Sequence, residues 1–332
     1  MQPQQQIIDM INANWLSQAV YVAAKLRIAD HLQAGPRSVD ELARLSQAHA
    51  PALYRLLRML ASKGVFFEES GQSFRTTPLA DCLRSDVPGS QYGLALMNGE
   101  EQYRAWGELL HSVKTGQTGF EKVFGKPIFD YLAENPEAAA TFDQAMVGVH
   151  GAETVAMLEA YDFSHVRTFC DIGGGNGSVL CALLQHHPGL KGMLYDLPNV
   201  IERAKGNLQR AGIAERCQCV AGSFFESVPA GADAYFLRHI LHDWYDDRCL
   251  TILKNIHAVL PAAGKVLVCE YVIPPGNDPS PGKLLDLTML VVPGGKERTE
   301  AEYRELFASA GLRLERVVNT PVGVSILEAV RG

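Results

Sequence analysis

The sequence lacks the features that mark several large classes of protein. No run of apolar residues approaches the roughly 20 that a membrane-spanning helix needs, and the polar start MQPQQQ is not expected to be a signal peptide. The seven cysteines are scattered and form no CxxC pair. Neither a disulfide framework nor a zinc site is therefore indicated, and a reducing cytoplasm is the expected compartment.

Basic residues are also scarce: 30 Lys and Arg against 37 Asp and Glu give a formal net charge of −7. An acidic chain is poorly suited to nucleic acid or to an anionic membrane surface, so we expect neither as a partner. What is present is ordinary for a globular protein, with 47% hydrophobic and 20% charged residues, which excludes a disordered chain or a coiled coil. At roughly 150 residues per domain, a chain of 332 residues favours two domains.

The first hundred residues are predicted to form helices followed by a small hairpin. Apolar residues at helical spacing predict a helix over 14–31. Ser38 begins the next helix as part of a capping box, and Pro51 begins a third. Two short strands across Ser70-Gly71 complete a winged-helix pattern.

A winged helix raises the possibility of DNA binding. Basic and acidic residues nearly balance over residues 1–100, whereas a DNA-binding protein needs many phosphate contacts for its affinity. The charge therefore favours packing or dimerisation as the role of this region.

Residues 100–165 are predicted to be mostly helical, and from 166 strands and helices alternate. The predicted strands are Arg167–Asp171, Gly192–Asp196, Arg216–Val220, Ala234–Arg238, Lys265–Tyr271, Arg313–Val318 and Val324–Val330. Such alternation is typical of a doubly wound parallel sheet. The turn at 319–323 is too short for a parallel crossover, so the last strand is expected to be antiparallel.

A glycine-rich loop, DIGGGNG at Asp171–Gly177, lies at a junction between a strand and a helix. Glycines such as Gly173 and Gly175 let the backbone approach a ligand closely, and a helix start offers free N–H groups. The dinucleotide motif needs a further glycine at 178, where this chain has Ser178. Asp196 ends the next strand, where a carboxylate can accept hydrogen bonds from both hydroxyls of a ribose.

The reactive residues of the sequence are expected in HILHD at 239–243. Imidazole and carboxylate are ordinary ligands for zinc or iron, so His239, His242 and Asp243 could bind a metal. They could equally belong to a strand end without chemical function. His242 could also be a general base at the carboxyl edge of the sheet, where doubly wound folds place their sites. The residues alone leave these three readings open.

Five motifs spread over the chain carry a family resemblance: DIGGGNG at 171–177, YDLP at 195–198, GSFFESVP at 222–229, LRHILHDW at 237–244 and PGGKERT at 293–299. Together with the winged-helix start, they resemble the class I S-adenosylmethionine-dependent O-methyltransferases of the plant caffeic acid and acetylserotonin type. Bacterial relatives of that family act in small-molecule biosynthesis.

The resemblance implies an α/β fold with a Rossmann-like, seven-stranded methyltransferase sheet whose last strand is antiparallel. It places a helical, winged-helix dimerisation domain over residues 1–100. A helical linker and the S-adenosylmethionine-binding catalytic domain would then occupy 101–332.

The same resemblance assigns a set of residues to the cofactor, S-adenosylmethionine: Asp171, Gly173, Gly175, Asp196, Gly222, Ser223, Phe224 and Arg238. Asp196 matches the acid that binds the ribose. Ser223 departs from the family, which usually has an acidic residue beside the adenine; its hydroxyl can bond the adenine amine, but without charge. Arg238 stands at a position that is commonly lysine.

Three residues are implied as catalytic. His242 matches the histidine that deprotonates the substrate hydroxyl, and Glu270 and Glu297 match glutamates that flank it. A phenol has a pKa of about 10 and a free histidine one of about 6.5, so a neutral imidazole can take the proton as the oxygen attacks. No metal is implied. The residues matched to the acceptor pocket are Trp106, Phe142, Met146, Asp243 and Met289.

The expected protein is a homodimeric methyltransferase that acts on a hydroxyl of a small aromatic or polyketide-like acceptor. One alternative is an enzyme of the same fold that performs decarboxylation or hydroxylation, although such relatives typically lack an intact base. A winged-helix regulator is the other alternative, and the balanced charge of residues 1–100 disfavours it.

Overall fold

The computed structural model describes residues 2–332. It divides into two compact units. The first unit holds the chain up to Arg104 together with Asp130–Gly151, and the second holds Ala105–Phe129 together with Ala152–Gly332. The sequence predicts one boundary near residue 100, whereas the chain passes between the compact units at two further places.

The first unit contains a winged-helix arrangement. Up to residue 104 its elements are α1 (Pro3–Ile11), α2 (Ala13–Lys25), α3 (Ile28–His31), β1 (Arg37–Ser38), α4 (Val39–Ser46), α5 (Ala50–Ser62), β2 (Phe67–Glu69), β3 (Ser73–Arg75), α6 (Pro78–Asp81), α7 (Tyr92–Gly99) and most of α8 (Glu101–Trp106), and most of α11 (Ile128–Glu134) and the first part of α12 (Pro136–Ala160) also belong to it. The three strands form an antiparallel sheet in the order β1-β3-β2. Buried residues of α5, among them Leu53, Leu57 and Leu60, pack in the core with Phe74.

Two predictions for this unit can be compared with the structure directly. The capping box is confirmed: the backbone N–H of Glu41 donates to Ser38 Oγ, and that of Ser38 donates to Glu41 Oε2. The single helix expected over 14–31 is wrong, because Arg27 adopts a left-handed conformation with φ 55° between α2 and α3. This break turns Ile28 into the core, where it is fully buried.

The second unit is built on a seven-stranded sheet. The strands are β4 (Thr168–Ile172), β5 (Lys191–Asp196), β6 (Cys217–Ala221), β7 (Ala234–Arg238), β8 (Lys265–Tyr271), β9 (Leu312–Asn319) and β10 (Val324–Arg331). Their order is β6-β5-β4-β7-β8-β10-β9. β10 runs antiparallel to both of its neighbours, and the pairs from β6 to β8 are parallel. The predicted fold class and the antiparallel last strand are confirmed.

The helices of the chain from residue 105 onward complete the architecture. They are α9 (Leu109–Thr115), α10 (Gly119–Phe124), α11 (Ile128–Glu134), α12 (Pro136–Ala160), α13 (Ser178–His186), α14 (Pro198–Arg210), α15 (Asp246–Val259), α16 (Pro281–Val291) and α17 (Glu300–Ser309), with 3₁₀ turns at Ala214–Arg216 and Leu241–Asp243. The sequence did not predict α16. Within residues 2–332, no helix combines the length and the apolar character that a membrane-spanning segment requires.

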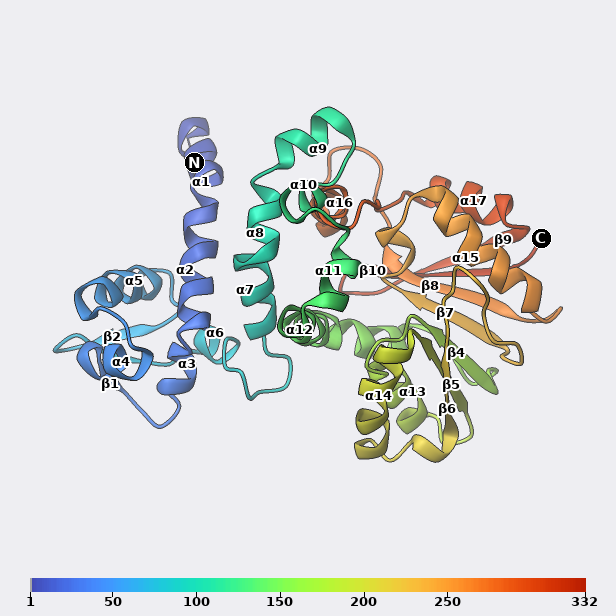
Figure 1. Cartoon of the computed structure of the whole chain (residues 1–332), viewed down its shortest axis with the longest axis horizontal. Coiled ribbons are helices and arrows are strands. Elements are labelled where there is room, and N and C mark those ends of the chain that lie inside the picture. Colours follow the sequence, from blue (N-terminus) through green and yellow to red (C-terminus); the bar gives the residue numbers. More distant parts are fainter. Residues whose placement is uncertain (1) are drawn as a thin grey trace. The chain divides into compact units, whose positions relative to one another are not determined.

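Helices cover both faces of the sheet (Figure 1). Along β7, Tyr235 and Leu237 pack into a core formed with α15 and α17. The alternate residues Ala234 and Phe236 pack into a second core, formed with α13 and α14. Because successive strand side chains point to opposite faces, one apolar strand serves both cores. Helices on both sides leave the carboxyl edge of the parallel strands as the place for a site.

Candidate active site

The glycine-rich loop follows β4, and its backbone adopts conformations that residues with a side chain rarely adopt. Gly173, Gly175 and Gly177 have φ angles of 67°, 57° and 77°, in the left-handed region that favours glycine. A β-carbon on Gly173 would lie 2.5 Å from Cδ1 of Ile240, whereas the space beside Gly175 is open to 4 Å. The loop therefore packs tightly at one end and leaves an open backbone surface at the other.

Asp196, at the end of β5, supports this loop. Its Oδ2 accepts a hydrogen bond from the backbone N–H of Gly175 at 2.9 Å, and its Oδ1 accepts one from Leu197 at 2.7 Å. β5 lies beside β4 in the sheet, which brings the carboxylate and the loop to the same edge.

Asp171, the last residue but one of β4, carries an oxygen without a partner. The side chain is buried, and among the described residues nothing hydrogen-bonds to its Oδ2. Burial raises the pKa of this carboxyl to about 7, although the charge of Arg238 acts in the opposite direction. A buried acceptor left unpaired is unusual in a folded protein, so this oxygen is a candidate partner for a donor on a ligand.

The loop after β6 packs against the glycine-rich loop. The backbone N–H of Gly222 donates to the carbonyl of Asp196, and the Phe224 ring lies 3.5 Å from the position of a β-carbon on Gly173. Ser223 Oγ accepts a hydrogen bond from the backbone N–H of Phe225. The structure thus brings the predicted residues of the two loops together, and it gives Ser223 a role in shaping its own turn.

His242 lies in the 3₁₀ turn Leu241–Asp243 that follows β7, and its side chain is buried. Its Nδ1 is 2.7 Å from Oε1 of Glu297, which is itself buried. Its Nε2 is 3.6 Å from Oδ1 of Asp243. One of the two glutamates that the resemblance places beside the ring is therefore hydrogen-bonded to it.

Glu270, the other glutamate, contacts the backbone of the same turn. Its Oε1 accepts hydrogen bonds from the N–H groups of Ile240, Leu241 and His242 at 3.1, 2.7 and 3.3 Å. Its Oε2 accepts a short hydrogen bond from the hydroxyl of Tyr303. Glu270 thus acts on His242 through the main chain and through its charge, a role that its sequence position did not indicate.

The carboxylates around His242 change its acidity. Burial alone lowers the pKa of the imidazole, but the charges of Asp243, Glu297 and Glu270 outweigh this effect and raise it to about 10. Burial also raises the pKa of Asp243 to about 7 and holds that of Glu297 above its usual range. The ordinary histidine pKa assumed from the sequence therefore does not apply here.

A second histidine lies beside the first. His239 has a φ of 53°, and its ring centre is 5.0 Å from that of His242. Its Nε2 is 2.9 Å from Oε2 of Glu153, on α12. Burial, with the charges of His242 and Arg238, lowers the pKa of His239 well below its usual range. The two histidines thus face different glutamates, and nothing in the sequence pattern pointed to Glu153.

The remaining predicted residues fall in both units. Trp106, Asp243 and Met289 belong to the second unit, and Arg238 there donates to Thr154 Oγ1 at 2.7 Å. Phe142 and Met146 lie on α12 in the segment that belongs to the first unit. The assignment of Arg238 to the cofactor, and of the other five residues to an acceptor pocket, stays a prediction.

Comparison with known proteins is consistent with this geometry. Residues 106–313 match the model of the O-methyltransferase domain, and residues 8–86 match that of the O-methyltransferase dimerisation domain.

Individual relatives match nearly the whole chain. The phenazine O-methyltransferase PhzM of Lysobacter antibioticus is 48% identical over 323 residues, which cover 97% of this chain and 95% of the relative. The crystal structure of LaPhzM superimposes with a TM-score of 0.97 at 46% identity, covering 100% of both chains. The structure of human N-acetylserotonin methyltransferase in complex with SAM superimposes with a TM-score of 0.93 at 30% identity, and the match covers 100% of this chain and 98% of the human chain. A glycine-rich loop, a glutamate-bound histidine and these matches together show that the chain belongs to the O-methyltransferase family.

Proposed function

We propose that this enzyme transfers a methyl group from S-adenosylmethionine to a hydroxyl of a small aromatic acceptor, with His242 as the general base. The observation that carries the proposal is the buried hydrogen bond of 2.7 Å between His242 Nδ1 and Glu297 Oε1. The relative from Lysobacter is named for O-methylation of a phenazine, which supports a flat aromatic acceptor.

The residues present fit S-adenosylmethionine. Asp171 offers a buried oxygen without a partner in the described chain, and Gly175 offers open backbone beside Asp196. An acid at the end of β5 is the group that is expected to accept hydrogen bonds from a ribose, and the half-buried Phe224 can cover an adenine. When bound, S-adenosylmethionine supplies a methyl group that its sulfonium charge has already activated.

The proposed work of His242 is proton removal. Because Glu297 occupies Nδ1, Nε2 is the ring nitrogen that can accept the proton of an acceptor hydroxyl. A phenol has a pKa of about 10, close to the pKa of about 10 to which the carboxylates raise His242, so the neutral fraction of the ring that accepts the proton grows as the pH rises towards that value. Transfer between groups of matched pKa costs little free energy, and the imidazolium that results is stabilised by Asp243, Glu270 and Glu297.

A homodimer is the proposed assembly, because α1 and the start of α2 expose a large apolar surface. No residue of α1 is buried, and Ile7, Met10, Ile11 and Trp15 are 54, 71, 68 and 67% exposed. Exposed apolar patches of this kind mark interaction sites, and a symmetric twofold is the commonest arrangement. The match to a dimerisation domain supports this assembly.

We also propose a cytoplasmic location, which agrees with all seven cysteines being free.

The proposal is tested by incubating the full-length protein with isotopically labelled S-adenosylmethionine and a panel of phenols and hydroxylated heteroaromatics. The expected result is label in the acceptor, on oxygen, and loss of that activity in His242→Gln. Label found on nitrogen would show that the methyl group is accepted by an amine and not by a hydroxyl. A protein that binds S-adenosylhomocysteine but decarboxylates or hydroxylates the acceptors would establish the diverged chemistry instead.

A further inference from the structure

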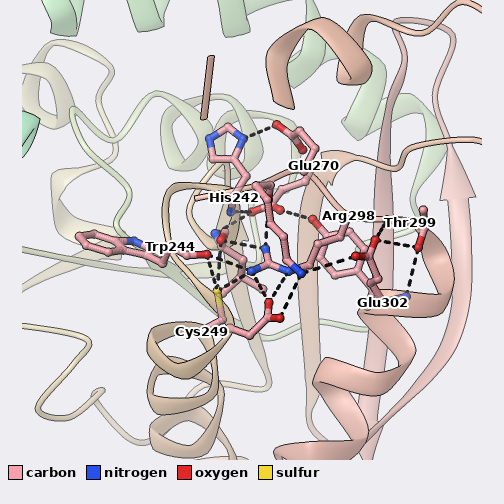
Figure 2. A network of polar contacts seen from close by, with 12 residues as sticks. His242, Trp244, Cys249, Glu270, Arg298, Thr299 and Glu302 are labelled. Carbon is pink, nitrogen blue, oxygen red and sulfur yellow. Dashed lines mark hydrogen bonds and ion pairs between the residues drawn. The ribbon is translucent and has the colours of Figure 1, made fainter. Parts of the chain in front are cut away.

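Arg298 follows Glu297 directly in the chain and is fully buried. Its Nη1 donates to the carbonyl of Leu241 at 3.0 Å, and its Nη2 donates to the carbonyl of Trp244 at 2.9 Å. These two carbonyls flank the residues His242 and Asp243. Figure 2 shows the guanidinium within this network, under the turn that carries the histidine.

A charged group of opposite sign holds the other polar side of the same turn. The carboxylate of Glu270 accepts hydrogen bonds from three backbone N–H groups of the turn. The guanidinium of Arg298 instead donates to two of its carbonyl groups. Both side chains have an exposed fraction of 0%. Hydrogen bonds to ionised partners are the strong ones in proteins, so the turn is held from both sides by bonds of this kind.

The segment that carries Arg298 is itself placed firmly. A β-carbon on Gly295 would lie 2.0 Å from the carbonyl oxygen of His242, so the two stretches of backbone are in direct contact. Thr299, the residue after Arg298, begins α17 with a capping box that includes Glu302. Arg298 is therefore held between a backbone contact and a capped helix.

Asp246 completes the arrangement. Its Oδ1 accepts from Nε and Nη2 of Arg298 at 3.1 and 2.8 Å, and it begins α15, the helix that follows the turn. The guanidinium thus joins the carbonyls of the turn to a carboxylate just beyond it.

We propose that Arg298, with Asp246 as its counter-ion, is a positioning residue that holds the backbone of the His242 turn, so that Nδ1 stays on Glu297 and Nε2 faces the acceptor. This inference rests on the proposed role of His242 as the base. The turn needs such support because its own hydrogen bonds are few: the N–H groups of Asp243 and Trp244 donate to Ile240 and Leu241 at 3.2 Å each.

A lysine cannot replace the arginine in this position. The planar guanidinium presents several donors in a fixed fork, whereas an ammonium is a compact point charge. Arg298→Lys keeps a positive charge for Asp246 but cannot bridge both carbonyls. A displacement of about 1 Å at a catalytic group can lower the rate by about 10²-fold, and we expect a loss of kcat of that order.

Arg216 provides a matched control within the same unit. It also binds backbone carbonyls through its guanidinium: Nη1 donates to His187 and Leu190, both at 3.2 Å, and Nη2 donates to Leu184 at 2.7 Å. It is the last residue of the 3₁₀ turn that precedes β6, and in the described part of the chain its guanidinium binds carbonyls between Leu184 and Leu190, away from the His242 turn. Arg216→Lys therefore reports what the loss of such a clamp does to folding alone.

The experiment compares Arg298→Lys, Asp246→Asn and Arg216→Lys with the wild type, at a temperature at which all four are folded. Four quantities are measured: kcat, the affinity for S-adenosylhomocysteine by calorimetry, the midpoint of thermal unfolding, and the downfield Nδ1–H proton resonance of His242, assigned by its absence in His242→Gln. We expect Arg298→Lys to lower kcat and to shift or broaden the resonance, with unchanged affinity. Asp246→Asn should do the same to a smaller degree. Arg216→Lys should change neither kcat nor the resonance.

Arg298→Lys with wild-type kcat and an unchanged resonance would overturn the proposal. So would losses of kcat in Arg298→Lys and Arg216→Lys that simply follow their losses of thermal stability. If His242→Gln keeps its activity, the assignment of the base is wrong, whereas the resonance still tests whether Arg298 holds the histidine.

Discussion

Nδ1 of His242 lies 2.7 Å from Oε1 of Glu297, and both side chains are buried. The hydrogen bond selects which ring nitrogen is free for chemistry and fixes the plane of the imidazole. It also places a negative charge where the ring would become an imidazolium.

Replacing His242 by Gln should lower kcat by about 10²–10⁴-fold, the contribution of a positioned general base. Binding of S-adenosylhomocysteine should be unchanged, because the side chain is proposed to remove a proton and not to hold the cofactor. Steady-state kinetics and calorimetric titration measure the two effects separately. His186→Gln, at an exposed position on α13, is the control. A His242 variant with more than about a tenth of wild-type turnover at neutral pH is incompatible with this role.

The pH dependence of kcat/KM should report the environment of His242. A general base must be unprotonated, so a pKa raised to about 10 means that kcat/KM increases as pH rises from neutrality towards that value. Glu297→Gln removes one of the charges that raise this pKa, so the increase should move to lower pH. The maximum rate should fall as well, because the ring loses its partner. Profiles of both proteins with the same acceptor test this, and an unmoved profile would show that Glu297 does not act on the ring.

Asp196→Ala should weaken the binding of S-adenosylhomocysteine. Hydrogen bonds to a charged group contribute about 1.5–3 kcal/mol, which corresponds to roughly ten- to a hundredfold in the dissociation constant. Part of the loss should come from the glycine-rich loop, because Asp196 accepts a hydrogen bond from Gly175. Asp196→Asn keeps one oxygen acceptor and should lose less. An unchanged dissociation constant in a folded Ala variant would refute the assignment.

Charged residues on the exposed face of α1 and α2 should break the proposed homodimer. Ile11 and Trp15 are 68 and 67% exposed, so a double substitution by Asp should leave each folded chain intact while making an apolar interface unfavourable. Light scattering at micromolar concentration should give a dimer for the wild type and a monomer for the variant. Val322→Asp, on the turn between β9 and β10, should remain dimeric. A wild-type chain that runs as a stable monomer would contradict the proposal.

Removal of divalent metal ions should leave the activity intact. The proposed step needs only a base and an activated methyl group, and Nδ1 of His242 is occupied by Glu297. Turnover after dialysis against EDTA, with and without added Mg²⁺ or Zn²⁺, measures this. Activity that disappears with the chelator and returns with an ion would support His239, His242 and Asp243 as metal ligands.

Local sequence signals were sufficient for most of the fold. The alternation of strands and helices predicted all seven strands of the large sheet, and the central strands β7 and β8 are apolar over most of their length because both of their faces are buried. The short turn before β10 required its antiparallel direction. The glycine-rich loop and the capping box at Ser38 were equally visible, since each depends on residues within a few positions of one another.

Other features depend on contacts between residues that are distant in the sequence. The break at Arg27 serves the burial of Ile28 in the core, and the helical pattern on both sides of it concealed the break. His242 and Glu297 are 55 residues apart, Leu241 and Arg298 are 57 apart, and Glu153 and His239 are 86 apart. No spacing rule in the chain links such pairs.

The sequence by itself thus determined the strands of the large sheet and most of the helices, the glycine loop and the histidine at the edge of the sheet. These follow from periodicity, turn chemistry and motifs that a short stretch of chain contains. Only the tertiary structure decided that Glu297 binds the ring, that Glu270 and Arg298 hold its backbone, and that the pKa of His242 is raised. Acidity and orientation are set by the charges and burial that surround a group in space, and folding brings those together from separate parts of the chain.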